Sequence, residues 1–309
     1  MCTAVCDGGL FGRTLDLEYS YSEAAVITPR NFEFRFLCGK TLKNHPAIIG
    51  IAYVTRNFPL YYDAMNEAGL CIAGLNFPGN ATYFKPREDK YNVASFEVIP
   101  WVLSKCRSVR EAVELLWNTN ITGESFSSDL AATPLHWLIS DKKESVTVES
   151  VESGLMIYDN PYGVLTNNPP FNYHTMYISN FMSLDSFQSK NTLAREVEMS
   201  HYSRGMGAIG LPGDYSSSSR FVRAVFAKEH TSDRCAHNIN RFFHILDTVT
   251  VPKGCVKTDE GKDVMTVYSS CVDMDSLEYH FTTYSNRSPS SLKMSQYDID
   301  TNKLFEMHI

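Results

Sequence analysis

The sequence lacks the features that mark a membrane protein, a nucleic-acid-binding protein or a zinc protein. Its apolar runs, such as residues 48–54, are far too short to span a bilayer. The chain carries 28 basic and 35 acidic residues, and its net charge of −7 argues against the basic surface that nucleic acid requires. No CxxC pair and no HExxH motif is present, so the sequence predicts no metal site, and nothing in it calls for a cofactor.

Signals for secretion and for disulfide bonding are missing as well. The N-terminus has no basic segment followed by an apolar stretch, so we expect a cytoplasmic protein. The eight cysteines are scattered along the chain, and we expect the seven that follow Cys2 to be reduced thiols. There is no repeat and no low-complexity linker, so residues 1–309 are predicted to form a single domain.

What the sequence does contain is a cysteine directly after the initiator methionine. Removal of Met1 would make Cys2 the N-terminal residue, with a thiol and a free α-amino group on one residue. An α-amino group has a pKa of about 7.7–8.0 and can act as a general base at neutral pH. The thiolate is the nucleophilic form of cysteine. Cys2 is therefore a candidate nucleophile that carries its own base.

The hydrophobic pattern around Cys2 predicts a β-hairpin. Residues 3–6 and 10–17 have strand character, and Asp7-Gly8-Gly9 between them is typical of a tight turn. Such a hairpin would hold Cys2 at the end of a sheet. It would also bring Arg13 and Asp16 back beside Cys2.

The rest of the chain alternates between helical and strand patterns, which favours a layered α+β fold over a parallel βαβ sheet. A capping box at residues 108–111 predicts a helix through Trp117. Strands are expected at 135–140, 145–152, 264–272 and 277–284. Ser219 is expected to cap a helix that runs to Lys228. A second amphipathic helix is expected to direct five side chains inward: Cys235, Ile239, Phe242, Phe243 and Leu246.

Four further motifs follow Met1-Cys2-Thr3 in order along the chain. They are Phe-Gly-Arg-Thr-Leu-Asp at 11–16, Ala-Gly-Leu-Asn-Phe-Pro at 73–78, Gly-Val-Leu-Thr-Asn-Asn-Pro at 163–169, and Gly-Leu-Pro-Gly-Asp at 210–214 leading to Ser-Arg-Phe at 219–221. Together they closely resemble the choloylglycine hydrolase family, which contains bile salt hydrolases and penicillin V acylases. The resemblance runs from residue 2 to at least Arg223. It implies an N-terminal-nucleophile hydrolase with a four-layer αββα sandwich.

The resemblance implies a role for each matching residue. Cys2 would be the nucleophile and its own amine the base, with Arg13 and Asp16 beside it. A carboxylate there would orient the amine, and a guanidinium close to sulfur would favour the thiolate. Without the resemblance, Arg13 and Asp16 could equally form a plain ion pair on a strand.

Two asparagines and a second arginine complete the implied set. Asn76 and Asn167 match the family's asparagines near the scissile carbonyl, where neutral amide donors suit an oxyanion hole. Both also lie next to Pro-containing segments, where asparagine is common in turns. Arg220 would give electrostatic support, because an arginine does not titrate in proteins.

Other titratable residues are interpreted as structural. His136, His174 and His201 could each serve as a general base, but the amine of Cys2 already fills that role. Glu149 and Glu152 lie on a predicted strand, and we expect both to be solvated.

Asn76 also bears on the substrate, because penicillin acylases tend to have tyrosine at that position. The resemblance therefore implies hydrolysis of the amide bond of a conjugated bile acid through a thioester on Cys2. Two alternatives stay open: penicillin V or N-acyl homoserine lactone acylase activity, and an unprocessed protein that binds steroid amphiphiles without catalysis. Candidate walls for the acyl pocket are Leu15, Phe58, Tyr61, Tyr62, Phe77 and the strand at 135–139.

The amino-acid half of the substrate suggests a further contact. Residues 202–205 resemble a rim loop near the leaving group, where Arg204 could bind a glycine conjugate's carboxylate through two parallel hydrogen bonds. A solvated surface arginine is the equal alternative. The resemblance also implies a homotetramer, with a small molecule as substrate and neither nucleic acid nor membrane as partner.

Overall fold

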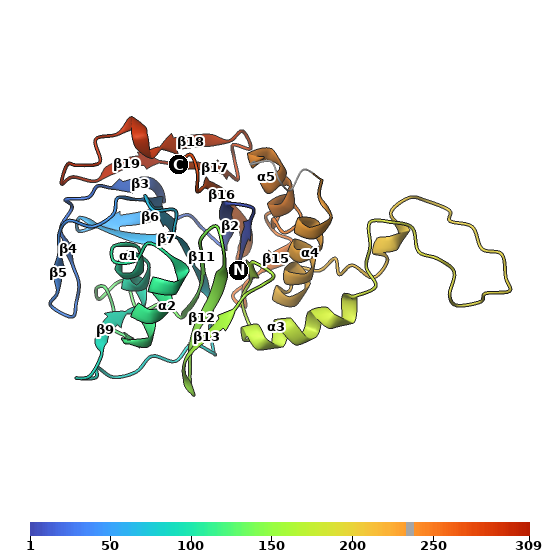
Figure 1. The fold of residues 1–309 in the computed structure, drawn as a ribbon, viewed down its shortest axis with the longest axis horizontal. Coiled ribbons are helices and arrows are strands. Elements are labelled where there is room, and N and C mark those ends of the chain that lie inside the picture. Colours follow the sequence, from blue (N-terminus) through green and yellow to red (C-terminus); the bar gives the residue numbers. More distant parts are fainter. Residues whose placement is uncertain (233–237) are drawn as a thin grey trace.

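The computed structural model describes residues 1–232 and 238–309, and two antiparallel β-sheets lie at its centre (Figure 1). The first sheet has seven strands in the order β14-β1-β2-β16-β17-β18, with β15 pairing β16. Their bounds are β1 (Cys2–Asp7), β2 (Leu10–Leu17), β14 (Val164–Leu165), β15 (Val256–Lys257), β16 (Asp263–Asp273), β17 (Glu278–Thr283) and β18 (Ser290–Lys293).

The second sheet has eight strands in the order β13-β12-β11-β8-β7-β6-β3-β19. Their bounds are β3 (Ala24–Thr28), β6 (Ile48–Thr55), β7 (Phe58–Asn66), β8 (Cys71–Asn76), β11 (Leu135–Ser140), β12 (Ser145–Val151), β13 (Gly154–Asp159) and β19 (Phe305–His308). Two small pairs lie outside the sheets: β4 (Phe34–Arg35) with β5 (Thr41–Leu42), and β9 (Tyr91–Ala94) with β10 (Thr119–Thr122).

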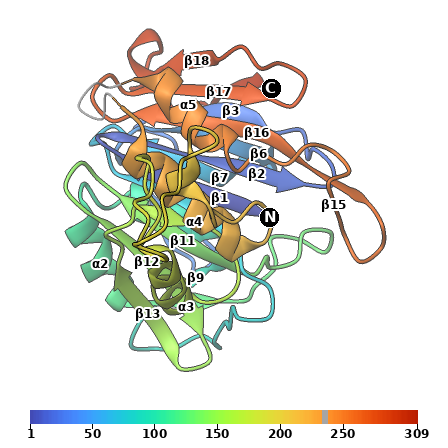
Figure 2. The same cartoon turned by 90° about the vertical axis from the view of Figure 1, so that its right-hand side faces the viewer.

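Helices cover the outer faces of both sheets. The helices α1 (Val98–Leu103) and α2 (Val109–Trp117) pack on the second sheet, whereas α4 (Ser217–His230) and α5 (Ile239–Asp247) pack on the first (Figures 1 and 2). The layers therefore run helix, sheet, sheet, helix, which confirms the predicted αββα sandwich. None of the described helices has the length and apolar character that crossing a membrane needs.

Burial on both faces of the sheets explains their nearly continuous apolar strands. In β6, Ile49 and Ile51 join the cluster between the sheets, while Ile48 and Ala52 join the cluster under α1 and α2. Successive side chains of a strand point to opposite faces, so a strand buried on both sides must be apolar at each position. Cys2 and Leu15 lie in the cluster between the sheets.

Most predicted elements are confirmed. The hairpin of β1 and β2 pairs Cys2 with Leu15, and Ser108 caps α2 by accepting the Glu111 N–H at 3.3 Å. The strands at 135–140, 145–151, 263–273 and 278–283 also match the prediction within a residue or two.

Two details of the predicted helices differ. The N-cap of α4 is Ser216, whose Oγ accepts the Ser219 N–H at 3.4 Å, so Ser219 lies inside the first turn and the predicted cap is wrong. In α5 the expected inward residues are buried, apart from the half-buried Ile239, while Cys235 lies outside the described residues.

One segment leaves the body of the molecule. After α3 (Phe171–Tyr177) and η2 (Ile178–Phe181), residues 182–209 form a loop that extends far from the sheets and returns toward α4 (Figure 1). The loop includes the short helix η3 (Met206–Ala208). We call this the protruding segment. Its exposed apolar side chains are Met182, Phe187, Leu193, Val197, Met199, Tyr202 and Ile209. The remaining short helices are η1 (Ser95–Glu97) and η4 (Met294–Gln296).

Candidate active site

Cys2 is the first residue of β1 and only 2 % of its surface is exposed. Its backbone N–H donates to Asn167 Oδ1 at 2.8 Å. The ammonium group of Met1 donates to the Asp16 carbonyl at 2.6 Å, and the Asp16 N–H donates back to the Met1 carbonyl at 2.9 Å. The Cys2 nitrogen would become the α-amine after removal of Met1, and it already faces the carboxamide oxygen of Asn167.

Glycines allow the hairpin to take this position. Gly8 and Gly9 form its turn with φ values of 56° and 87°, a conformation that favours glycine. At Gly12, a Cβ would lie 1.9 Å from the Ser270 carbonyl oxygen, so only glycine permits β2 to approach β16 this closely. The glycine in the 11–16 motif is thus required by packing.

Arg220 reaches the nucleophile from α4 and is fully buried. Its Nη1 donates to the Cys2 carbonyl at 2.5 Å and to Thr3 Oγ1 at 2.7 Å, and its Nη2 donates to Asn167 Oδ1 at 2.7 Å. Burial lowers the pKa of Arg220, and the nearby Asp16 and Cys2 oppose that shift. Three contacts from one guanidinium fix the first strand and Asn167 relative to each other.

The 210–214 motif anchors α4 in the orientation that Arg220 needs. The Asp214 carboxylate accepts hydrogen bonds from the Ser216 N–H at 2.9 Å and the Ser219 hydroxyl at 2.6 Å, and the Ser216 and Ser219 groups lower the pKa of Asp214 to about 2. Arg223 donates to the carbonyls of Pro212 and Asp214 at 2.8 and 2.5 Å. This motif therefore stabilises the N-terminus of α4 and takes no part in the reaction itself.

Asn167 and Asn76 are brought together beside Cys2. The Asn167 side-chain amide donates to the Asn76 carbonyl at 2.7 Å, and Asn167 is 8 % exposed. The Asn76 Oδ1 atom is buried and has no hydrogen-bond partner among the described residues. In this structure Asn167 orients the Cys2 nitrogen through its oxygen. The oxyanion-hole role of both residues stays a prediction.

Asp16 is fully buried close to Cys2. Its carboxylate accepts hydrogen bonds from Thr266 Oγ1 at 2.6 Å and from Thr14 Oγ1 at 3.3 Å. The neighbouring hydroxyls hold the carboxylate in one orientation, while its backbone pairs with Met1. Asp16 is therefore fixed at the N-terminus, as the hairpin predicted.

Arg13 lies between the two sheets and is also fully buried. Its Nη1 donates to the carbonyls of Gly74 at 2.6 Å and Tyr62 at 2.9 Å, both on the second sheet. It forms no ion pair with Asp16 among the described contacts, so the plain ion-pair interpretation is wrong. Burial disfavours its charge, yet the surrounding groups raise its pKa on balance: Cys2, Tyr268, Asp63 and Asp16.

Asp63 is a buried carboxylate that the sequence analysis missed. It lies on β7 and accepts hydrogen bonds from the hydroxyls of Tyr268 at 2.6 Å and Ser270 at 3.0 Å, and from that of Tyr279. Burial raises the pKa of Asp63, while Arg13 and the hydroxyl groups act in the opposite direction. A single Asp inside the apolar run of residues 58–66 was the signal that could have revealed it.

The expectation that Glu149 is solvated is wrong. Glu149 is fully buried, and its Oε1 accepts the Phe171 N–H at 3.0 Å and faces His136 Nδ1 at 3.0 Å. Glu152 is exposed, as expected. The difference arises because β12 packs under the 163–169 loop at Glu149 and ends before Glu152.

Among the described contacts, none joins His136, His174 or His201 to Cys2. His136 and His174 are buried and contact the carbonyls of Thr166 and Asn167, at 2.9 and 3.0 Å. His201 is exposed on the protruding segment and contacts a backbone carbonyl there. The structural interpretation of these side chains agrees with their contacts.

The candidate pocket walls divide between the two faces of the second sheet. Leu15 and Tyr62 lie in the cluster with Cys2, whereas Phe58 and Tyr61 lie in the cluster under α1 and α2. Phe77 is fully buried and stacks on the His136 ring, with ring centroids 4.2 Å apart. In this structure Phe58, Tyr61 and Phe77 therefore do not line a pocket at Cys2, because they point away from it or are covered.

Arg204 lies on the protruding segment and is exposed. That segment extends away from the sheets (Figure 1). No contact between Arg204 and a site residue occurs among the described residues, so the role of Arg204 at the leaving group stays a prediction.

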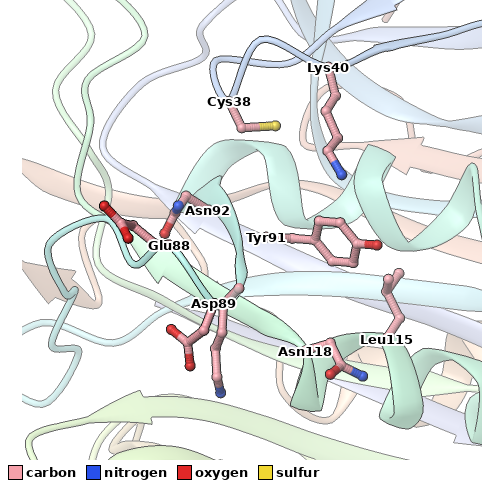
Figure 3. A pocket seen from close by; sticks show the side chains of 9 residues that line it. Cys38, Lys40, Glu88, Asp89, Tyr91, Asn92, Leu115 and Asn118 are labelled. Carbon is pink, nitrogen blue, oxygen red and sulfur yellow. The ribbon is translucent and has the colours of Figure 1, made fainter.

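A separate surface pocket of about 540 Å³ contains none of these residues. Lys40 extends toward the Tyr91 ring, 3.8 Å from its centroid, and Cys38 lies beside it (Figure 3). The other lining residues are Glu88, Asp89, Lys90, Asn92, Leu115 and Asn118. No cluster of potential metal ligands occurs in the described part of the chain.

Comparisons with known proteins identify the family of this chain. Residues 4–307 match the family model of linear amide C–N hydrolases, choloylglycine hydrolase family. The chain therefore belongs to the choloylglycine hydrolase family, and it is a linear amide C–N hydrolase.

Individual relatives cover nearly the whole chain. The bile salt hydrolase/transferase of Lactiplantibacillus plantarum is 46 % identical over 98 % of this chain and 95 % of its own length. The bile salt hydrolase/transferase of Clostridium perfringens is 34 % identical over the same shares. A solved mutant of the conjugated bile acid hydrolase from Clostridium perfringens superposes with a TM-score of 0.93 at 32 % identity, over 100 % of this chain and 97 % of that chain. Penicillin V acylase from Agrobacterium tumefaciens shares the fold, with a TM-score of 0.78 at 20 % identity, over 100 % of this chain and 91 % of that chain.

Proposed function

We propose that this protein hydrolyses the amide bond of glycine- or taurine-conjugated bile acids, with Cys2 as nucleophile after removal of Met1. The observation that carries the proposal is the 2.8 Å contact between the Cys2 nitrogen and Asn167 Oδ1, with Arg220 on the same oxygen. This contact supports Cys2 as a nucleophile whose own nitrogen is held beside a cation. The similarity to bile salt hydrolases over 98 % of the chain supports the substrate class.

The chemistry follows from these positions. The Cys2 amine takes the thiol proton, and the sulfur attacks the amide carbonyl carbon to form a C–S bond. The C–N bond then breaks, and the leaving amine takes the proton from the Cys2 ammonium. Water, deprotonated by the same amine, hydrolyses the thioester and returns the free bile acid and the thiol. Amide donors of Asn76 and Asn167 would stabilise the oxyanion of each tetrahedral intermediate.

Further features of the proposal concern the whole protein. We expect residues 1–309 to act as one domain, in the cytoplasm and as a homotetramer. The exposed apolar side chains of the protruding segment, of which Leu193 is 93 % exposed, support an assembly that covers them. Light scattering on purified protein tests the subunit number, and a monomer would contradict it.

A side-by-side assay tests the function. Purified protein is given glycocholate, taurocholate, penicillin V and an N-acyl homoserine lactone, and the intact mass is measured in the same preparation. We expect a mass that lacks Met1 and a preference for the bile acid conjugates. Faster hydrolysis of penicillin V or the lactone would favour an acylase, and an inactive protein that retains Met1 would favour a binding role. Full activity with Met1 retained would contradict the amine as base.

A further inference from the structure

A buried pair, Glu149 and His136, lies beneath the loop that carries Asn167. The two residues are fully buried and lie on adjacent strands β12 and β11, and the His136 ring is stacked flat against Phe77 with an interplanar angle of 7°. Glu149 Oε1 accepts the Phe171 N–H at 3.0 Å, and His136 Nε2 contacts the Thr166 carbonyl at 2.9 Å. The pair therefore holds both ends of residues 166–171.

The contacts of His136 and Glu149 join the two ends of this loop. The Thr166 carbonyl only accepts, so His136 Nε2 donates to it. Glu149 Oε1 accepts the Phe171 N–H, and His136 Nδ1 faces the same oxygen at 3.0 Å. One carboxyl oxygen therefore links the Phe171 backbone to the ring that holds Thr166.

The backbone of Asn167 is held from two more sides. Its N–H donates to Ser217 Oγ at 2.8 Å, and its carbonyl accepts from His174 Nε2 at 3.0 Å. Burial lowers the pKa of His174, so its ring is neutral with its single hydrogen on Nε2. With the backbone held in this way, the carboxamide of Asn167 faces the Cys2 nitrogen, the Asn76 carbonyl and Arg220 Nη2.

We propose that Glu149 and His136 are positioning residues of the active site. They touch no reacting atom and act by fixing Thr166 and therefore Asn167, which orients the Cys2 nitrogen. This inference rests on the proposed function, because it assigns that nitrogen the role of base. It explains why a carboxylate and an imidazole are buried together at a place where two apolar residues would also pack.

Glu149→Gln tests the charge with little change of shape. The amide replaces the carboxyl group whose Oε1 meets both the Phe171 N–H and His136 Nδ1, so residues 166–171 are held less firmly. We expect kcat for glycocholate to fall roughly 10–100-fold with KM unchanged within about twofold, since a small misplacement of a catalytic group has effects of this size. Glu152→Gln is the matched control on an exposed residue and should match wild type. Unchanged kcat in Glu149→Gln would overturn the proposal.

A double-mutant cycle separates positioning from loss of folding. In the Asn167→Ala background, Glu149→Gln should reduce kcat less than about twofold further, because the residue through which it acts is gone. Effects that multiply would show that Glu149 does not act through Asn167. Thermal unfolding of each variant accompanies the cycle.

Two substitutions of His136 provide a second test that does not depend on Glu149→Gln folding. His136→Gln places an amide donor near the former Nε2 and keeps the Thr166 contact, whereas His136→Asn places it near Nδ1 and loses that contact. We expect His136→Gln to keep several-fold more kcat, and equal or reversed activities would overturn the proposal.

Hydrolysis of glycocholate by wild type distinguishes a failure of this inference from a failure of the proposed function. If wild type hydrolyses glycocholate and the variants match it, only the inference fails. If wild type does not hydrolyse glycocholate, the proposed substrate fails, and the variants are compared by alkylation of Cys2 with iodoacetamide. We then expect the alkylation rate of Cys2 in Glu149→Gln to be lower than in wild type by a factor of roughly three or more. Equal rates would overturn the inference.

Discussion

Replacing Asp63 with alanine should be among the most destabilising single changes in this protein. Its carboxylate lies between the two sheets, where three hydroxyl groups of the first sheet donate to it. It also lies near the buried cation of Arg13, whose hydrogen bonds within the described part of the chain go to backbone carbonyls. The substitution thus removes an acceptor from each hydroxyl and the opposing charge from Arg13.

The expected loss follows from those contacts. A buried donor left without a partner costs about 1–3 kcal/mol, and breaking one side of a buried charge pair costs about 3–5 kcal/mol. These values overlap, because the hydroxyls can rotate toward one another, so we expect a total of about 3–5 kcal/mol. A typical domain has a free energy of unfolding of about 5–15 kcal/mol, so the loss is a large share of the total.

Guanidinium denaturation at one fixed protein concentration measures the effect. Asp63→Asn keeps an acceptor oxygen and should lose less than Asp63→Ala. Asp259→Ala, at an exposed turn, is the control and should unfold like wild type. If Asp63→Ala unfolds at the wild-type midpoint, the hydroxyl cluster and Arg13 do not depend on this carboxylate, and the reasoning is refuted.

Four further predictions concern the site. Cys2→Ala should abolish hydrolysis while the protein still folds by circular dichroism, and iodoacetamide should label Cys2 of wild type before the other cysteines; turnover by the alanine variant would exclude it as nucleophile. Asn76→Ala or Asn167→Ala should reduce kcat by roughly 10²–10³, and an increase in KM alone would assign that residue to substrate binding. Arg204→Ala should lower the ratio of glycocholate to taurocholate efficiency if Arg204 meets the carboxylate of the substrate, and an unchanged ratio would remove it from the site. Burial lowers the pKa of His174, so the unfolded state binds its proton first, and stability should fall as pH falls from about 6.5 through the lower folded pKa; His174→Gln should flatten that dependence in denaturation measured across pH.

Local sequence patterns were sufficient for the elements that hold the nucleophile. Asp7-Gly8-Gly9 between two strand-like runs predicts the hairpin, because a tight turn needs residues that accept positive φ and the flanking strands must pair directly. The hairpin alone then places Asp16 beside the N-terminus. The family motifs correctly identified Asn167 and Arg220 as residues that come together with Cys2, although 165 and 53 residues separate the contacting pairs.

Burial and side-chain direction were decided by the tertiary structure. Glu149 and Glu152 look alike in sequence, yet only Glu149 is covered, because the 163–169 loop and α3 pack over that part of β12. Phe77 was expected at the substrate because of its neighbours in sequence, but packing stacks it on the buried His136 ring. A sequence pattern reports which residues a strand or turn contains, whereas the partner that covers a side chain comes from elements far away in the chain, and only folding brings those together.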